Sequence, residues 1–326
     1  MKTKRTTLIS SLKWKPLLFA VPVVCVASLT GCQWTPFGTT QNAEGVGKEK
    51  LITDAVTKMS SARSMDADID AKMTATAQMS GVKLGVNAVT GLNVQSAKAD
   101  NASHAKGNVT FELIGEKGSL DIETYSLDKD NTRYTYIKQS DLLTGDTGWI
   151  VAKDSKETAG QKNAGADVEA FSRLNLGNLL GLYNSAKDSM AGLSLKDGTQ
   201  KIEGKECYVV EGSLKGEDVK ALTDGLGFDI PGIPGLPKPD LAGVDADIKM
   251  YFEEASGDPY IIELKIPEVK GVSETNPLTF GIDNIDATIK FNSFNANDEI
   301  KVPEEVEKGA IVSVDSQSVL DMLNAK

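Results

Sequence analysis

The chain has 326 residues, a formal net charge of −11, 40% hydrophobic residues and only 6% aromatic residues. This length and apolar content allow a sizeable core in one large domain or two small ones. The acidic balance argues against nucleic acid as a partner, because phosphate binding needs clustered Lys and Arg. It also argues against a protein body that lies flat on anionic lipid.

The N-terminal segment is typical of an export signal. Its basic residues are Lys2, Lys4, Arg5, Lys13 and Lys15. Residues 16–29 follow as an apolar run that is too short to span a bilayer as a mature helix. We therefore expect residues 1–31 to be a signal peptide. Its removal takes away five positive charges, so the formal net charge changes from −11 to −16.

Residues 29–32 read Leu-Thr-Gly-Cys, which resembles the lipobox of bacterial lipoproteins. The resemblance implies that the Cys32 thiol receives a diacylglyceryl group and that the chain is cut just before it. Two acyl chains suffice for stable attachment, so we expect a protein anchored at the cell membrane on its extracytoplasmic face. The alternative is an ordinary signal peptide with an incidental Cys.

A tether and a helix are expected next. Residues 32–47 are polar and without periodicity, which predicts a flexible tether. The following apolar residues recur at helical spacing and predict an amphipathic helix from Lys48 to about Ser61. They are Leu51, Ile52, Ala55, Val56 and Met59.

The next hundred residues mostly alternate between apolar and polar side chains, which predicts strands. In the longest run, one face carries Ile69, Ala71, Met73, Ala75, Ala77 and Met79. Further strands are expected at residues 82–88, 108–113, 120–124, 134–137 and 149–152. The short links between them, including a turn at residues 128–131, indicate an antiparallel meander.

The pattern changes after residue 152. A loop over 153–166 precedes apolar residues at helical spacing over 167–192, which include Phe171 and Leu179. Strands are expected again at 201–203, 206–213, 247–252, 260–266 and 284–294. Residues 304–326 are expected to form a C-terminal tail with a short helix near residues 319–323.

Residues 225–243 form an apolar segment rich in Gly and Pro, and the prolines exclude a helix interior or a central strand. We interpret the segment as a lid over an apolar opening, or as a tip that touches a membrane or a partner. Its apolar side chains are Phe228, Ile230, Ile233 and Leu236. A loop packed on its own core is the alternative.

The cysteines and the single histidine do not predict catalysis. Cys25 leaves with the signal and Cys32 takes lipid, so Cys207 is alone and is expected to be a small buried hydrophobic residue. His104, its one candidate catalytic partner, lies in a polar stretch. The sequence has no nucleophile elbow, zinc motif or phosphate loop, so we expect neither an enzyme nor a cofactor or metal.

Strands that share one apolar face, together with apolar helices, predict an α+β fold: a large curved antiparallel sheet with helices on its concave face. The small side chains on that face allow two outcomes. Either the helices nest closely, or a cavity remains that suits an acyl chain. The residues expected to line this cavity are Ala71, Met73, Ala75, Met79, Phe171, Leu179 and Ile289.

Three stretches, residues 204–210, 257–260 and 294–303, together with the order of elements, resemble the LolA/LprG-like lipoprotein superfamily in its Gram-positive branch. The resemblance covers residues 48–303, which we expect to form one domain. It implies a half-barrel that carries a lipid, and no catalytic residues. We therefore expect a lipid or other apolar ligand. The alternative is a structural or regulatory envelope lipoprotein that binds a protein partner and no ligand.

Overall fold

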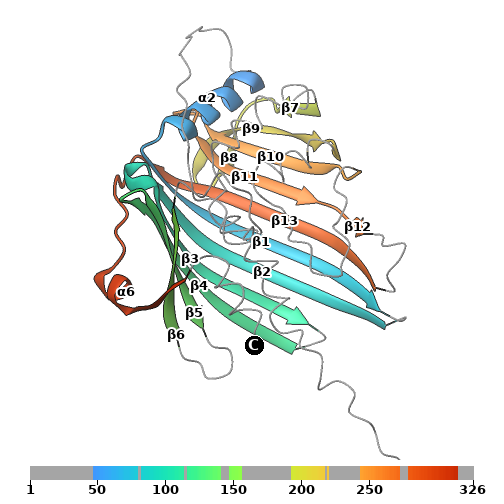
Figure 1. Cartoon of the computed structure of the whole chain (residues 1–326). Helices are drawn as coiled ribbons and strands as arrows, with labels where there is room; N and C mark the ends of the chain where they lie inside the picture. Colours follow the sequence, from blue (N-terminus) through green and yellow to red (C-terminus); the bar gives the residue numbers. More distant parts are fainter. Residues whose placement is uncertain are drawn as a thin grey trace, which may run out of the picture.

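The computed structural model describes residues 47–79, 82–113, 116–140, 147–155, 192–216, 219, 243–271 and 278–314. Within these ranges the dominant element is one 14-stranded sheet (Figure 1). Its described strand pairs are antiparallel, apart from one parallel pair at an edge. The sheet is curved and open, which confirms the predicted fold class.

The first half of the sheet is the expected meander. Its strands are β1 (Ser64–Met79), β2 (Val82–Ala97), β3 (Ala102–Leu113), β4 (Glu116–Lys129), β5 (Thr132–Ser140) and β6 (Thr147–Ser155). They neighbour one another in chain order, with the short 3₁₀ helix η1 (Ala99–Asn101) between β2 and β3. Strands β1 and β2 have 16 residues each and are longer than the alternation of apolar residues predicts.

The second half contains β7 (Leu193–Leu195), β8 (Gln200–Ile202), β9 (Lys205–Leu214), β10 (Ala246–Glu253), β11 (Pro259–Ile266), β12 (Val269–Gly271) and β13 (Leu278–Phe294). Strand β13 pairs with β1 and joins the two halves, so the order continues β1-β13-β11-β10-β9-β7. The register between β13 and β1 skips Asn292 and Asp283. Such bulges bend a strand and increase its twist, which contributes to the curvature of the sheet.

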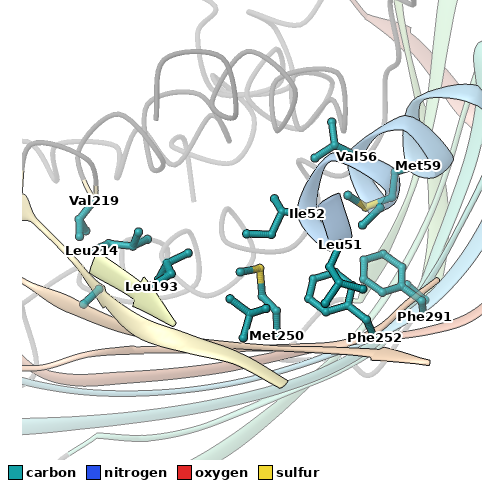
Figure 2. Packing of buried hydrophobic residues seen from close by; sticks show 14 of the residues in the cluster. Leu51, Ile52, Val56, Met59, Leu193, Leu214, Val219, Met250, Phe252 and Phe291 are labelled. Atoms are coloured by element: carbon teal, nitrogen blue, oxygen red, sulfur yellow. The ribbon is translucent and has the colours of Figure 1, made fainter. Parts of the chain in front are cut away.

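Helix α2 (Lys48–Ser61) lies on the concave face, as expected (Figure 1 and Figure 2). Its predicted apolar residues Leu51, Ile52, Ala55, Val56 and Met59 are all buried. They belong to a cluster with side chains of β9, β10 and β13, among them Val210, Phe252 and Phe291. We call this cluster the helix-covered core. The burial of one helical stripe accounts for the stability of a helix that has no side-chain cap.

The convex face carries two smaller apolar clusters. One lies on β9–β11 and contains Cys207, Val209, Tyr251, Tyr260 and Ile261. The other lies on β4–β6, where Tyr125, Tyr136 and Val151 pack with Val306 of helix α6 (Glu304–Gly309). Strand β14 (Ala310–Val314) then pairs parallel to β6. The sheet therefore continues past residue 303 into the segment that the sequence assigned to a tail, while the helix expected near 319–323 lies outside the described residues.

Candidate ligand-binding face

The structure brings four of the predicted cavity residues to one face of the sheet. Ala71, Met73 and Ala75 follow one another on the concave side of β1, opposite Thr90, Ala88 and Val86 of β2. On the other side of β1, Ile289 lies opposite Ile69. Met79 ends the same strand and pairs with Val82 and Leu278, but its side chain lies outside what the structure describes.

These residues lie at the border of two apolar clusters. Met73 and Ile289 are half-buried and pack against the helix-covered core. Ile289 also packs against a second concave cluster on β1–β4, formed by Ile69, Leu92, Val94, Ala105, Val109 and Ile122. We call the concave side of β1–β4, which carries this cluster together with Ala75, Ala88 and Gly107, the small-residue face. The apolar concave surface is therefore continuous from β10 to β4.

Polarity increases toward the end of the sheet where β1 begins. One row across the concave side carries the hydroxyls of Ser96, Ser103, Ser126 and Thr135 on β2 to β5. The last two lie 3.1 Å apart, between the Ser126 Oγ and Thr135 Oγ1 atoms. The next row holds the cross-strand pair Asp128 and Arg133, in which Arg133 Nη1 donates to Asp128 Oδ1 at 3.0 Å.

Sequence reasoning missed this polar end, although a signal for it was present. The expected turn at 128–131 is a two-residue hairpin loop, in which Asp130 and Asn131 have φ angles of 50° and 62°. Asn and Asp tolerate this left-handed backbone. A two-residue loop at 130–131 places Asp128 directly opposite Arg133, so the pair was readable from the turn type.

The convex side of the same strands is polar. Asn93 and Asn292 each donate through Nδ2 to both Asp66 and Asp68, at 2.8–3.0 Å. Gln95 Nε2 donates to Asp66 Oδ2 at 2.9 Å. Amide donors hold these carboxylates in place, and the side chains remain partly exposed to water. Strand β1 therefore separates an apolar concave face from a wet convex one, as its alternation predicts.

Cys207 and His104 both lie on the convex side but are six strands apart in the sheet order. Cys207 is fully buried, which confirms its role as a small hydrophobic residue, and burial raises the pKa of its thiol. His104 stacks on Tyr125 with ring centroids 4.2 Å apart, and burial lowers the pKa of its imidazole. Among the residues that the structure describes, no three acidic, His or Cys side chains form a group that would hold a metal.

Several predicted site residues lie outside the described ranges. They are Cys32, Phe171, Leu179, Phe228, Ile230, Ile233 and Leu236. Lipid attachment, the far wall of the cavity and the lid therefore stay predictions. None of the helices in the described part of the chain is long and apolar enough to cross a membrane.

No protein-family model matches the chain, and no curated protein matches it. The solved structures that are similar to this chain include two from mycobacteria. LprF from Mycobacterium bovis is 12% identical with a TM-score of 0.37, and 78% of this chain covers 95% of that one. The lipoprotein LppX from Mycobacterium tuberculosis is 12% identical with a TM-score of 0.34, and 78% of this chain covers 97% of it. At these TM-scores they carry no argument about a shared ligand.

Proposed function

We propose that this protein is an envelope lipoprotein, anchored through Cys32, whose concave sheet face holds the apolar part of a lipid without chemical conversion. The observation that carries the proposal is the continuous apolar surface from β10 to β4, on strands whose opposite side is polar around Asp66 and Asp68. Large side chains fill the part under α2, whereas the concave side of β1 and β2 also carries Ala71, Ala75 and Ala88. We place the ligand beside these small side chains.

The dimensions and energies suit an acyl chain. Strands of 16 residues are roughly 53 Å long at about 3.3 Å per residue. An acyl chain spans half of a hydrocarbon core about 30 Å thick, so it fits along this face. Each buried CH₂ group contributes about 0.8 kcal/mol, which offsets the cost of ordering the ligand. Met73, whose side chain is unbranched and flexible, would adapt to chains of different shape.

Anchoring and charge fit the same role. A diacylglyceryl group on Cys32 supplies two acyl chains, and a mature charge of −16 keeps the folded body away from anionic lipid. The tether over residues 33–47 would then hold the concave face near the membrane without contact. Replacement of Cys32 by Ala should release the protein from washed membranes, and membrane-bound Cys32→Ala protein would contradict the anchor.

The test is to purify the full chain, measure its mass by native mass spectrometry and then extract it with organic solvent. A covalent anchor stays with the protein, so any extracted lipid is bound cargo. We expect about one bound lipid per chain. A chain without extractable lipid that also fails to bind a fluorescent fatty acid would overturn the proposal.

In that case the alternative is an interaction lipoprotein. It is favoured by the convex centre, where amides hold Asp66 and Asp68 and neither carboxylate has an ion pair among the described residues, so this surface stays negative. A basic envelope protein or polymer would bind there, and its affinity would fall steeply with salt. Salt-insensitive binding would contradict this role.

A further inference from the structure

Arg133 lies at the polar end of the concave face, between two hairpin ends. It shares the concave side of β5 with Thr135, because residues two apart on a strand point to the same side. Its Nη1 atom donates to the Asn101 carbonyl oxygen at 2.8 Å and to Asp128 Oδ1 at 3.0 Å. Only 11% of its side chain is exposed. The guanidinium is therefore fixed in position from one side.

The other edge of this guanidinium carries the Nε and Nη2 atoms. Its Nε and Nη2 atoms are buried and have no hydrogen-bond partner among the described residues. A buried donor without a partner loses hydration and gains nothing in return. The N–H groups of Nε and Nη2 lie side by side and match the two oxygens of a carboxylate or phosphate. This edge therefore has the donor geometry that a bidentate anionic acceptor requires.

Polarity along the face gives the direction in which such a ligand would lie. From Arg133 the concave side passes through the hydroxyl row of Ser103, Ser126 and Thr135, and then reaches Val94 and Ala105 in the small-residue face. The order is charge, hydroxyl, hydrocarbon. An amphiphile with an anionic head and an acyl tail has the same order of groups.

We propose that Arg133 binds the anionic head group, a carboxylate or a phosphate, of the lipid whose acyl chain lies along β2–β4. This inference rests on the proposed function and adds the class and the orientation of the ligand. Asp128 already balances the charge of Arg133, so a small free anion gains little beyond two hydrogen bonds. An amphiphile adds the burial of its chain, which is why we assign the site to a lipid head and not to free phosphate.

The experiment compares two fluorescent probes with the same acyl chain, one a fatty acid and the other the fatty alcohol. Both are titrated against the full chain and against Arg133→Gln and Arg133→Lys. Arg63→Gln is the matched control, because Arg63 is exposed and pairs with Asp298 at the protein surface. Inorganic phosphate and acetate are tested as competitors without a chain. Thermal unfolding of each variant reports whether the fold is intact.

We expect both Arg133 variants to bind the fatty acid about tenfold or more weakly, since hydrogen bonds to charged groups contribute that much. Binding of the alcohol should change little, and Arg63→Gln should bind both probes like the parent chain. Equal loss for acid and alcohol would mean a structural role and would overturn the inference, as would no loss at all. Displacement of the acid by millimolar phosphate would assign the site to a free anion. If neither probe binds the parent chain, the proposed function itself fails.

Discussion

The two faces of the sheet differ in how their apolar side chains are distributed. The concave face is one continuous apolar surface, in which Ile289 touches both the helix-covered core and the small-residue face. The convex face is interrupted: two apolar clusters at β9–β11 and β4–β6 flank the wet centre around Asp66 and Asp68. A strand such as β1 therefore has a single apolar side. The concave side therefore carries the main buried core of the domain, and it is also the side to which the proposal assigns a ligand.

The helix-covered core should give the largest effect. Phe252 on β10 is 2% exposed and packs under α2 (Figure 2). Phe252→Ala removes a large buried ring and leaves a cavity, so the free energy of unfolding should fall by about 3–5 kcal/mol. Denaturant unfolding followed by circular dichroism measures it. A loss below about 1 kcal/mol would show that this part of the concave face is not the main core.

The small-residue face should resist an added side-chain atom at Gly107 on β3. A Cβ atom on Gly107 would lie 2.0 Å from the Gly91 carbonyl oxygen and 2.5 Å from Leu92 Cδ2. Gly107→Ala should therefore cost about 1–3 kcal/mol in unfolding free energy. Gly85→Ala is the control, because a Cβ there meets nothing within 4 Å. Equal stability of the two variants would contradict the close packing of this face.

How far the sequence predicts this arrangement depends on how each element is specified. Helix α2 and the central part of β1 follow from their own apolar periodicity, because each buries one stripe or one side. Strands β10 and β11 bury residues on both sides, so their apolar runs and not a strict alternation indicate them. The strand character of residues 89–97 was missed, because Thr90 and Ser96 occupy concave positions where an apolar residue was expected. The alternation of apolar and polar residues therefore underestimates the length of a strand whose buried side carries hydroxyl groups.

Other features depend on partners distant in the chain. The three-residue strands β7 and β12 are defined by pairing with β9 and β13, and their own sequences are too short to show a period. The junction of β1 with β13 links residues that are 199 to 229 positions apart. Of the candidate site, the alternation placed Ala71, Met73 and Ala75 together correctly. The role of Arg133 depends on burial and on unpaired nitrogen atoms, which a sequence does not display.

A substitution at the proposed ligand site should lower the affinity for a fatty acid without affecting the helix-covered core. Ala71 is half-buried on β1, so Ala71→Trp would occupy space beside Met73 that the proposal assigns to an acyl chain. Affinity for a fluorescent fatty acid should fall about tenfold, equivalent to about 1.4 kcal/mol. Val89→Trp is the control, since Val89 is 47% exposed on the convex side of β2. Equal losses for the two variants would contradict a ligand on the concave face.

The smallest expected effect comes from the convex side and concerns the single histidine of the chain. Burial lowers the pKa of His104 below its usual 6.5, an effect that Lys106 reinforces and Glu123 opposes. In the unfolded chain His104 is therefore protonated as pH falls through about 6.5, whereas in the folded chain it is still neutral at that pH. Stability is then fully present above that pH and is lost as pH falls toward the lower pKa of the folded state.

Other acids contribute little in this window. Burial raises the pKa of Glu123, but Lys106 and Lys138 outweigh burial and lower that pKa overall, so the carboxylate stays ionised in this window. Because His104 is only partly buried, we expect the loss to stay below about 1 kcal/mol, or roughly 2–4 °C in Tm. Thermal unfolding at closely spaced pH values measures it, with His104→Gln as the comparison. The variant should lose the slope over this window. Two outcomes would contradict this prediction: a slope that persists in the variant, or a parent chain that becomes more stable as pH falls. Either would mean that the neutral imidazole stacked on Tyr125 does not stabilise the convex cluster on β4–β6.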